Sequence, residues 1–276
     1  MKLTFRKMHG LGNDFMVIDT RDQVVSLDTF KIQALGDRRT GVGFDQLVLI
    51  ETPEDKEKAD VFMRIRNRNG SIAETCGNAL RCIAKLICEE TGKDECSIDT
   101  LAGINAAKRD GDIYTINMGA PKFDWQSIPL SDEMDTASLN ITDGPLHDPM
   151  AVSVGNPHAV FFVEDVNGID LEDFGPRIET HPYFPEKTNV EIVQVMDEKD
   201  LRMRVWERGT GITGACGTGA AASMAAAVKK GLIGRKANVH LDGGVLAFHW
   251  NEEDNNIYMS GPATLSYIAE MDCNDC

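Results

Sequence analysis

ETCGNALRCIAKLICEE (74–90) and GACGTGAAASMAAAVKKG (214–231) are the two stretches that decide the fold of this 276-residue chain. Each has a short loop of small or polar residues, then a Cys-Gly pair, then an Ala- or Leu-rich run of helical character. The two cysteines, Cys76 and Cys216, are separated by about half the chain length. The repeat predicts two similar halves, each with a helix that begins directly after a cysteine.

Strand-like segments surround both stretches. Residues 3–19 read as two strands joined by a Gly-rich loop, and 61–71 alternates apolar and polar residues before a turn at Asn69-Gly70. Residues 97–121 read as two strands about a turn at Asp110-Gly111. Strands, helix and strands with hairpin-length connections favour an α+β fold, in which a mixed or antiparallel sheet wraps around one central helix per domain.

The irregular stretch 121–149 is rich in Asp, Pro and Ser, and we interpret it as the domain junction. We therefore expect an N-terminal domain at 1–120 that carries Cys76 and a C-terminal domain at 121–262 that carries Cys216. A final strand or tail at 263–276 is expected to return to the N-terminal domain. The two domains are expected to be related by a pseudo-twofold axis, with an active site in the cleft between them.

Composition and charge narrow the class of protein. Hydrophobic residues make up 42% of the chain, and 28 Lys and Arg stand against 44 Asp and Glu, a formal net charge of −16. Such acidity argues against nucleic acid or an anionic membrane as a partner. The sequence has no secretory signal and no apolar run of membrane-spanning length, so we expect a cytoplasmic protein. Seven cysteines, an odd number, argue against a disulfide framework.

Two motifs invite a cofactor or metal assignment, and we reject both. Gly209-x-Gly211-x-x-Gly214 resembles a dinucleotide fingerprint, but two lysines, 229 and 230, stand where the acidic residue is expected. Cys273-x-x-Cys276 supplies half the ligands of a zinc site and has no matching second pair. We expect neither a cofactor nor a metal.

The paired cysteines suggest proton transfer. A thiol at a helix N-terminus lies in a positive field, which favours the thiolate. Two such thiols suggest a two-base mechanism, in which one removes an α-proton and the other delivers one. Unpaired amides at the two helix starts are expected to hold a substrate carboxylate, at Gly77, Asn78, Gly217 and Thr218. The alternative is that both cysteines are only small buried residues that pack well at helix starts.

In six blocks the chain resembles the diaminopimelate epimerase family, cofactor-independent enzymes of lysine and peptidoglycan precursor synthesis. The blocks follow one another in the family's order and run through nearly the whole chain. They are KMHGLGNDF (7–15), GVGFDQL (41–47), RNRNGSIAETCGNALRC (66–82), VGNPH (154–158), TNVEIVQV (188–195) and WERGTGITGACGTGAAA (206–222).

The resemblance implies an isomerase that epimerises LL-diaminopimelate to the meso form as a homodimer, with Cys76 and Cys216 as the acid/base pair. It implies that His158 and Glu207 help to set the protonation of the thiols, and that Arg208 binds the distal carboxylate. The implied substrate-binding positions are Asn13, Gln46, Asn67, Gly77, Asn78, Asn156, Asn189, Glu207, Arg208, Gly217 and Thr218.

The chain departs from the family pattern at three places. Ala79 replaces a glycine after Cys-Gly-Asn, Ile212 replaces a glutamate, and the block at 66–72 differs from the usual aromatic-Asn-x-Asp-Gly-Ser-Glu. Two alternatives therefore stay open. One is a related racemase of another amino acid, of the histidine or proline type, and the other is a non-catalytic amino-acid-binding protein on the same scaffold.

Overall fold

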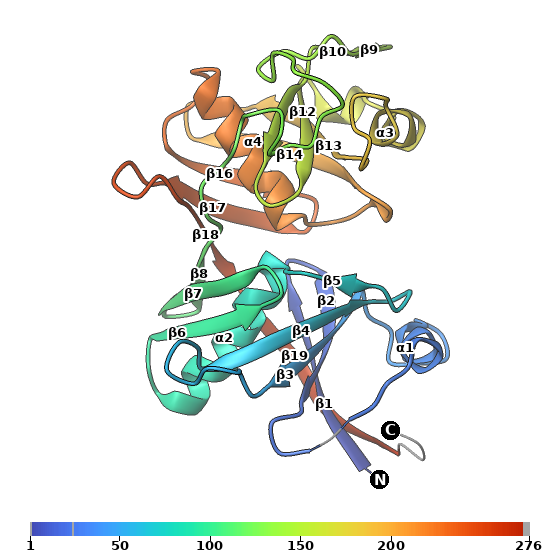
Figure 1. Ribbon diagram of the computed structural model, residues 1–276, viewed down its shortest axis with the longest axis vertical. Coiled ribbons are helices and arrows are strands. Elements are labelled where there is room, and N and C mark those ends of the chain that lie inside the picture. The colour runs from blue at the N-terminus through green and yellow to red at the C-terminus, as the bar shows by residue number, and fades with distance from the viewer. Residues whose placement is uncertain (1, 24, 273–276) are drawn as a thin grey trace. The chain divides into compact units, whose positions relative to one another are not determined.

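The computed structural model describes residues 2–23 and 25–272, so the Cys273-x-x-Cys276 motif lies outside the described residues. The chain forms two compact units, which Figure 1 colours along the chain. The first unit comprises the residues up to Ile116 and those from Gly261 onward, and the second comprises Asn117–Ser260. The boundaries expected at 120 and 262 thus fall at 116 and 260.

The first unit is a mixed sheet that wraps around helix α2 (Gly77–Thr91). Two pairs are parallel, β2 with β3 and β4 with β6, and the other neighbours run antiparallel. Helix α2 packs against β1, β6 and β7, and α1 (Thr29–Gly36) lies against β3. Across the sheet the strands are β19 (Thr264–Asp272), β1 (Lys2–Gly10), β2 (Asn13–Asp19), β3 (Gln46–Glu51), β4 (Val61–Asn67), β6 (Glu95–Thr100), β7 (Gly103–Asp110) and β8 (Ile113–Asn117), with β5 (Ile72–Ala73) paired to β4.

The second unit repeats this plan around helix α4 (Gly217–Lys229). Its parallel pairs are β12 with β13 and β14 with β16. They correspond to β2 with β3 and β4 with β6 in the first unit. Helix α3 (Leu171–Glu179) takes the place of α1, while β9 (Thr142–Asp143) and β10 (Leu146–His147) form a separate ribbon. The strands are β11 (Met150–Ser153), β12 (Pro157–Phe162), β13 (Asn189–Val195), β14 (Asp200–Glu207), β15 (Gly211–Ile212), β16 (Lys236–Leu241), β17 (Gly244–Trp250) and β18 (Ile257–Pro262). The prediction of two similar domains, each with a mixed sheet around a central helix, is confirmed.

The two central helices are buried for different reasons. Along α2, apolar residues such as Leu80, Ile83 and Ile87 form one buried face, and Gly92 ends the helix in the left-handed region at φ 70°. In α4 the run of small residues from Ala220 to Ala227 is buried on all sides. Short side chains let the surrounding strands approach this helix closely.

The hairpin turn predicted at Asn69-Gly70 is present, but the sequence patterns did not predict a further turn before Gly103. Gly70 adopts φ 86° between β4 and β5, as expected for the Asn69-Gly70 turn. The segment 97–121 contains three strands rather than two, because the chain also turns at Leu101-Ala102 before Gly103, whose φ is 109°. The apolar residues around that turn hid it.

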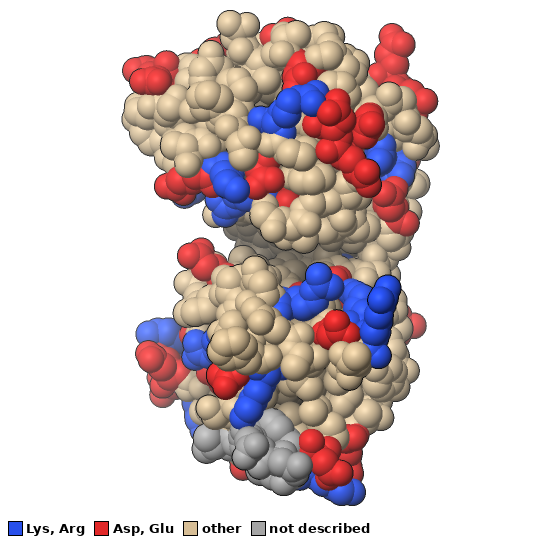
Figure 2. Space-filling model, turned by 90° about the vertical axis from the view of Figure 1, so that its right-hand side faces the viewer, with Lys and Arg blue, Asp and Glu red and all other residues tan. Residues whose placement is uncertain are grey.

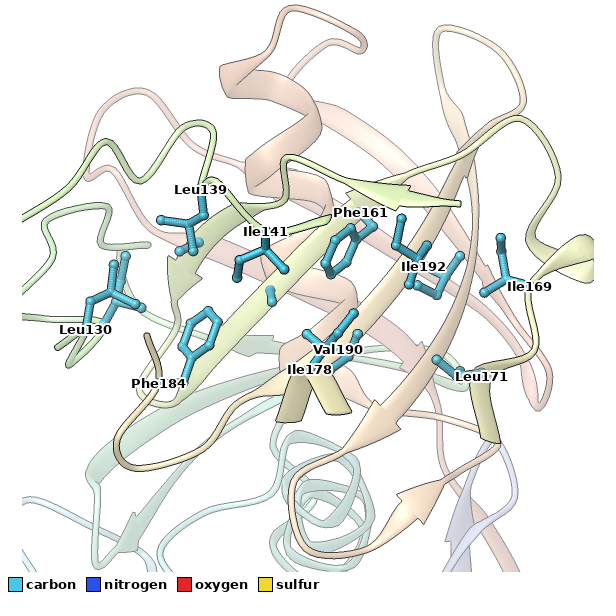
Figure 3. Packing of buried hydrophobic residues seen from close by; sticks show 14 of the residues in the cluster. Leu130, Leu139, Ile141, Phe161, Ile169, Leu171, Ile178, Phe184, Val190 and Ile192 are labelled. Atoms are coloured by element: carbon cyan, nitrogen blue, oxygen red, sulfur yellow. The ribbon is translucent and has the colours of Figure 1, made fainter. Parts of the chain in front are cut away.

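The irregular stretch 121–149 belongs to the core of the second unit. Ile128, Leu130, Leu139 and Ile141 from this stretch are almost fully buried. They pack with residues of β12, β13 and α3, as Figure 3 shows. Apolar residues at irregular spacing have no helical or strand periodicity, so sequence patterns alone suggested only a junction.

Acidic and basic side chains are interspersed on the face drawn in Figure 2. No helix within 2–23 or 25–272 is long and apolar enough to cross a membrane. Within the same ranges, no three His, Cys, Asp or Glu side chains are grouped so that they could hold a metal ion.

Candidate active site

In the first unit, Cys76 is the residue that precedes helix α2, with extended backbone dihedrals and a partly buried side chain. Its Sγ lies 3.7 Å from Oδ1 of Asn13, which comes from the start of β2. The same oxygen accepts a hydrogen bond of 3.1 Å from Nδ2 of Asn78. The fold therefore brings three of the predicted site residues together, although 63 residues separate Asn13 from Cys76.

A cluster of charges holds Asn13 in place. Asp45 Oδ2 accepts 3.0 Å from Asn13 Nδ2, and Arg38 bridges Asp45 and Asp14 at 2.7 Å each. Burial alone would raise the pKa of Asp14, but hydrogen bonds and charges from Arg38 and Lys7 outweigh burial and lower that pKa to about 2. Asp14 is thus an anion at neutral pH and anchors the loop that presents Asn13.

Gln46 and Asn67 face each other across β3 and β4. Gln46 Nε2 donates to Asn67 Oδ1 at 2.9 Å, and Asn67 Nδ2 donates to Ser71 Oγ at 2.9 Å. Within the described part of the chain, the buried Oε1 of Gln46 has no hydrogen-bond partner. Such an acceptor suits a donor group on a ligand, because an unmatched buried polar atom costs about 1–3 kcal/mol.

Arg81 is a site residue that sequence reasoning missed. Its side chain is 0% exposed, Nη2 donates 3.0 Å to Asn78 Oδ1, and Nε donates 3.2 Å to the carbonyl of Pro262. Its charge interacts with Cys76 and thereby favours a thiolate there. An arginine on the otherwise apolar face of a predicted helix is the signal that would have found it.

In the second unit, Cys216 precedes helix α4 in the same way and is 5% exposed. The backbone N–H of Gly219 donates to its Sγ at 3.3 Å, so the thiol caps its own helix. Thr218 Oγ1 lies 3.5 Å from the sulfur and accepts a 3.4 Å hydrogen bond from Asn156 Nδ2. Three predicted site residues again meet at one helix start.

Carboxylates surround Cys216. Glu207 hydrogen-bonds to the Cys216 thiol and to the Thr213 hydroxyl. Burial raises the pKa of the Glu207 carboxyl. Burial first, then the charges of Glu207 and Glu191, raise the pKa of Cys216 well above its ordinary value. The expectation that the helix N-terminus would favour a thiolate is therefore wrong for Cys216, which is a thiol at neutral pH.

His158 is fully buried. Its Nδ1 is 2.7 Å from Oε1 of Glu191, and its Nε2 is 2.9 Å from Oδ1 of Asn156. Glu191 was missed by the sequence reading, although a glutamate in the middle of the apolar strand TNVEIVQV (188–195) signals a buried ionisable group. Burial raises the pKa of this carboxyl.

Asn189 and Arg208 form a connected pair. Asn189 Nδ2 donates 2.9 Å to the carbonyl of Pro157, and its Oδ1 accepts 2.9 Å from the backbone N–H of Arg208. The guanidinium of Arg208 is exposed and donates 3.0 Å to the carbonyl of Glu186. Asn189 therefore shapes the turn that presents Arg208.

The predicted residues thus form two clusters, one in each unit. The first holds Asn13, Gln46, Asn67, Cys76, Gly77 and Asn78. The second holds Asn156, His158, Asn189, Glu207, Arg208, Cys216, Gly217 and Thr218.

The fold of two repeated units, each a mixed sheet around a buried helix, is shared with solved structures that include an epimerase. A hydroxyproline epimerase from Agrobacterium vitis, with bound trans-4-hydroxy-L-proline, matches with a TM-score of 0.68 at 14% identity, over 99% of this chain and 93% of that one. A phenazine biosynthesis protein of the PhzF family from Bacillus anthracis matches with a TM-score of 0.70 at 17% identity, over 99% of this chain and 100% of that one. At these identities the likeness concerns the fold alone.

Sequence comparison narrows the class to one family. The model of the family described as diaminopimelate epimerase matches residues 5–123 and 150–266. The diaminopimelate epimerase of Rhodospirillum centenum is 45% identical over 97% of this chain and 91% of its own length. That of Erythrobacter litoralis is 45% identical over 100% of this chain and 99% of its own length. The chain belongs to the diaminopimelate epimerase family.

Proposed function

We propose that this chain converts LL-diaminopimelate to meso-diaminopimelate without a cofactor, with Cys76 and Cys216 as acid and base on opposite faces of one α-carbon. The single observation that carries the proposal is the repeated placement of a Cys-Gly pair at the start of each unit's buried helix. Family membership supports the substrate, and with it a role in lysine and peptidoglycan precursor synthesis.

The surroundings of the thiols suggest which one moves the proton first. Cys216 lies beside two carboxyl groups and is protonated, so it is suited to donate a proton. Cys76 interacts with the buried guanidinium of Arg81 and is suited to accept one. After one turnover the roles are reversed, so the same pair serves the back reaction.

The helix starts supply the electrostatic part of catalysis. The first N–H groups of a helix have no intrahelical acceptor and carry partial positive charge. At Gly77, Asn78, Gly217 and Thr218 they would bind the α-carboxylate and stabilise the charge that enters it as the α-proton leaves. Acid–base help alone contributes about 10²–10⁴-fold, so this preorganised field must supply most of the acceleration.

Binding of the distal, unreacted end gives specificity in this proposal. The exposed guanidinium of Arg208 would pair with the distal carboxylate. The unmatched Oε1 of Gln46 would accept a hydrogen bond from a substrate ammonium. Asn67 would hold the side-chain amide of Gln46 in position. Sites built to hydrogen-bond a group reject analogues that lack it by about 10⁴–10⁵-fold.

Substitution of either cysteine tests the mechanism. We expect Cys76→Ser and Cys216→Ser each to lower kcat by at least about 100-fold, because serine is too weak an acid and base for the step. Cys96→Ala is the matched control, since its thiol is buried on β6 outside both clusters, and it is expected to keep kcat. Full activity in either serine variant, with a native circular dichroism spectrum, would exclude the two-thiol mechanism.

A substrate panel separates the alternatives. In heavy water, turnover of diaminopimelate is expected to place deuterium at the α-carbon, and exchange with proline or histidine instead would favour a related racemase. Arg208→Ala is expected to impair only substrates with a distal carboxylate. Binding of diaminopimelate without any exchange would favour the non-catalytic binding protein.

We also propose that the enzyme is a cytoplasmic homodimer. Reduced thiols are required by the mechanism, and Cys82, Cys88, Cys96 and Cys216 are free. Light scattering of the purified protein would measure the mass, and a monomer at working concentration would contradict the dimer.

A further inference from the structure

The carboxyl group of Glu191 lies where an ionised group is costly. It projects from the middle of β13, is 0% exposed, and has Oε1 at 2.7 Å from His158 Nδ1. Its other oxygen, Oε2, is buried and has no hydrogen-bond partner in the described ranges. A full negative charge with one oxygen unpaired would be strongly disfavoured.

A continuous chain of polar contacts runs from this carboxyl to the thiol of Cys216. His158 Nε2 lies 2.9 Å from Asn156 Oδ1, and Asn156 Nδ2 donates 3.4 Å to Thr218 Oγ1. The Thr218 hydroxyl lies 3.5 Å from Cys216 Sγ. Each group in the chain therefore orients the next.

The directions of these bonds locate the protons. The amide oxygen of Asn156 only accepts, so Nε2 of His158 carries a proton. A proton must also lie between His158 Nδ1 and Glu191 Oε1, since two lone pairs would otherwise face each other at 2.7 Å. The pair thus shares one proton and has no net charge.

Gly219 couples the carboxyl to the sulfur a second time. A Cβ at this position would lie 2.7 Å from Glu191 Oε1 and 3.3 Å from Cys216 Sγ. The carboxyl therefore packs against the backbone whose N–H caps the thiol.

We propose that Glu191 is a positioning residue for the reaction proposed above, which holds the shared proton at His158 Nδ1 and, through Asn156 and Thr218, orients the Cys216 thiol. The charged and titratable groups around it come from three further elements: His158 on β12, Glu207 on β14 and Cys216 before α4. Without the proton shared with His158, a charged Glu191 would repel Glu207 and the thiolate that forms when Cys216 gives up its proton.

Two substitutions at position 191 test the proposal. Glu191→Gln keeps the shape and donates an amide N–H to His158 Nδ1, so the imidazole keeps its proton on Nε2. Glu191→Leu fills the space without a polar atom and leaves Nδ1 unmatched. Val193→Ala, on the same face of β13, is the control for lost packing, because strand residues two apart share a face.

With diaminopimelate, we expect Glu191→Leu to lower kcat about 10- to 100-fold with KM within about threefold of the wild type. The kcat of Glu191→Gln should lie within about threefold of the wild-type value, and that of Val193→Ala should equal the wild-type value. A Gln variant as slow as the Leu variant overturns the proposal, and so does a Leu variant with unchanged kcat.

Nitrogen-15 NMR of histidine-labelled protein without substrate provides a readout that is independent of activity. Nε2 of His158, assigned with a His158→Gln protein, should carry a proton in all three proteins, because Asn156 Oδ1 accepts from it. Nδ1 should have the chemical shift of a hydrogen-bonded nitrogen in wild type and in Glu191→Gln, and that of a nitrogen with a free lone pair in Glu191→Leu. An Nδ1 chemical shift in the Leu variant equal to that of the wild type overturns the proposal. A protein that does not exchange diaminopimelate but shows this change at Nδ1 would refute the reaction while supporting the role of Glu191.

Discussion

At the scale of single residues, Cys76 and Cys216 share a sequence context but have neighbours of opposite charge. The positive field of a helix start is worth about 0.3–1 kcal/mol at exposed sites. A buried guanidinium beside Cys76 adds to that field, whereas buried carboxyl groups beside Cys216 oppose it. Because buried charges interact more strongly than a helix dipole, burial and the neighbouring carboxyl groups outweigh the helix start at Cys216 and raise its pKa.

Gly219→Ala is the residue-scale prediction. Alanine in place of glycine within a helix ordinarily stabilises by about 1 kcal/mol. Here the new methyl would lie 2.7 Å from Glu191 Oε1, so we expect a lower free energy of unfolding and a slower enzyme. Urea unfolding and steady-state kinetics measure the two effects.

A double-mutant cycle identifies the cause. The loss of unfolding free energy caused by Gly219→Ala should be smaller when Glu191 is also replaced by alanine, because the colliding carboxyl is then absent. Gly168→Ala is the control, since a Cβ there meets no atom within 4 Å. Additive effects of the substitutions at 219 and 191 would refute the proposed collision.

At the scale of elements, a charged cluster fastens β1 and the start of β2 to the segment that follows α1. Lys7, Asp14, Arg38 and Asp45 make the contacts, and Asp45 in turn holds Asn13. The start of β2, which carries Asn13, is therefore held by these ion pairs in addition to its ladder with β1.

Asp14→Asn is the element-scale prediction. The pKa of Asp14 is lowered from 3.8 to about 2 on folding, so its contribution to stability is fully present above pH 3.8 and is lost as pH falls through about 2. We expect the variant to be less stable than wild type by at most about 2 kcal/mol at pH 7, with the difference shrinking below pH 4. Urea unfolding at several pH values measures it.

Asp55→Asn removes an exposed ion pair with Lys58 and is the control, for which only a small change is expected. A difference between Asp14→Asn and wild type that stays constant from pH 7 to pH 2 would contradict the ion-pair explanation.

At the scale of the whole molecule, the first unit is discontinuous in sequence while the second is not. Strand β19, near the end of the chain, pairs with β1 along nearly its full length. It covers Leu3 and Phe5, and Tyr267 stacks edge-on against Phe5 with ring centroids 6.2 Å apart. The first unit is therefore incomplete without the end of the chain.

Fragments test this organisation. A fragment of residues 117–260 is expected to unfold cooperatively by itself, since its apolar cluster is contained within it. A fragment of residues 1–116 is expected to lack cooperative unfolding, because β1 would lose β19, one of its two partner strands, and expose Leu3. Thermal unfolding by circular dichroism checks both.

The matched control joins 1–116 to 261–276 through a short Gly-Ser linker, which restores β19. We expect this fragment to recover cooperative unfolding. If residues 1–116 unfold with the same cooperativity with and without β19, this strand does not contribute to the stability of the first unit.

Much of the fold was predictable from local patterns. The Cys-Gly starts of α2 and α4, the alternation of Val61, Met63 and Ile65, and the glycine at position 70 each depend on near neighbours in sequence. The roles of Ile128 and Ile141 were not predictable, because they lie in irregular backbone and are buried by elements far along the chain. The polar residues Arg81 and Glu191 lie in a regular helix and a regular strand. Their roles escaped because they depend on partners remote in sequence, Pro262 for Arg81 and His158 for Glu191.

By itself, the sequence determined the repeat, the position of each cysteine at a helix start, and the family. These properties follow from periodicity, helix-start chemistry and motif order, which are local. Only the tertiary structure decided that Cys216 lies among carboxyl groups and that Glu191 shares a proton with His158. Burial and the distance between groups remote in sequence set those properties, and both exist only once the chain has folded.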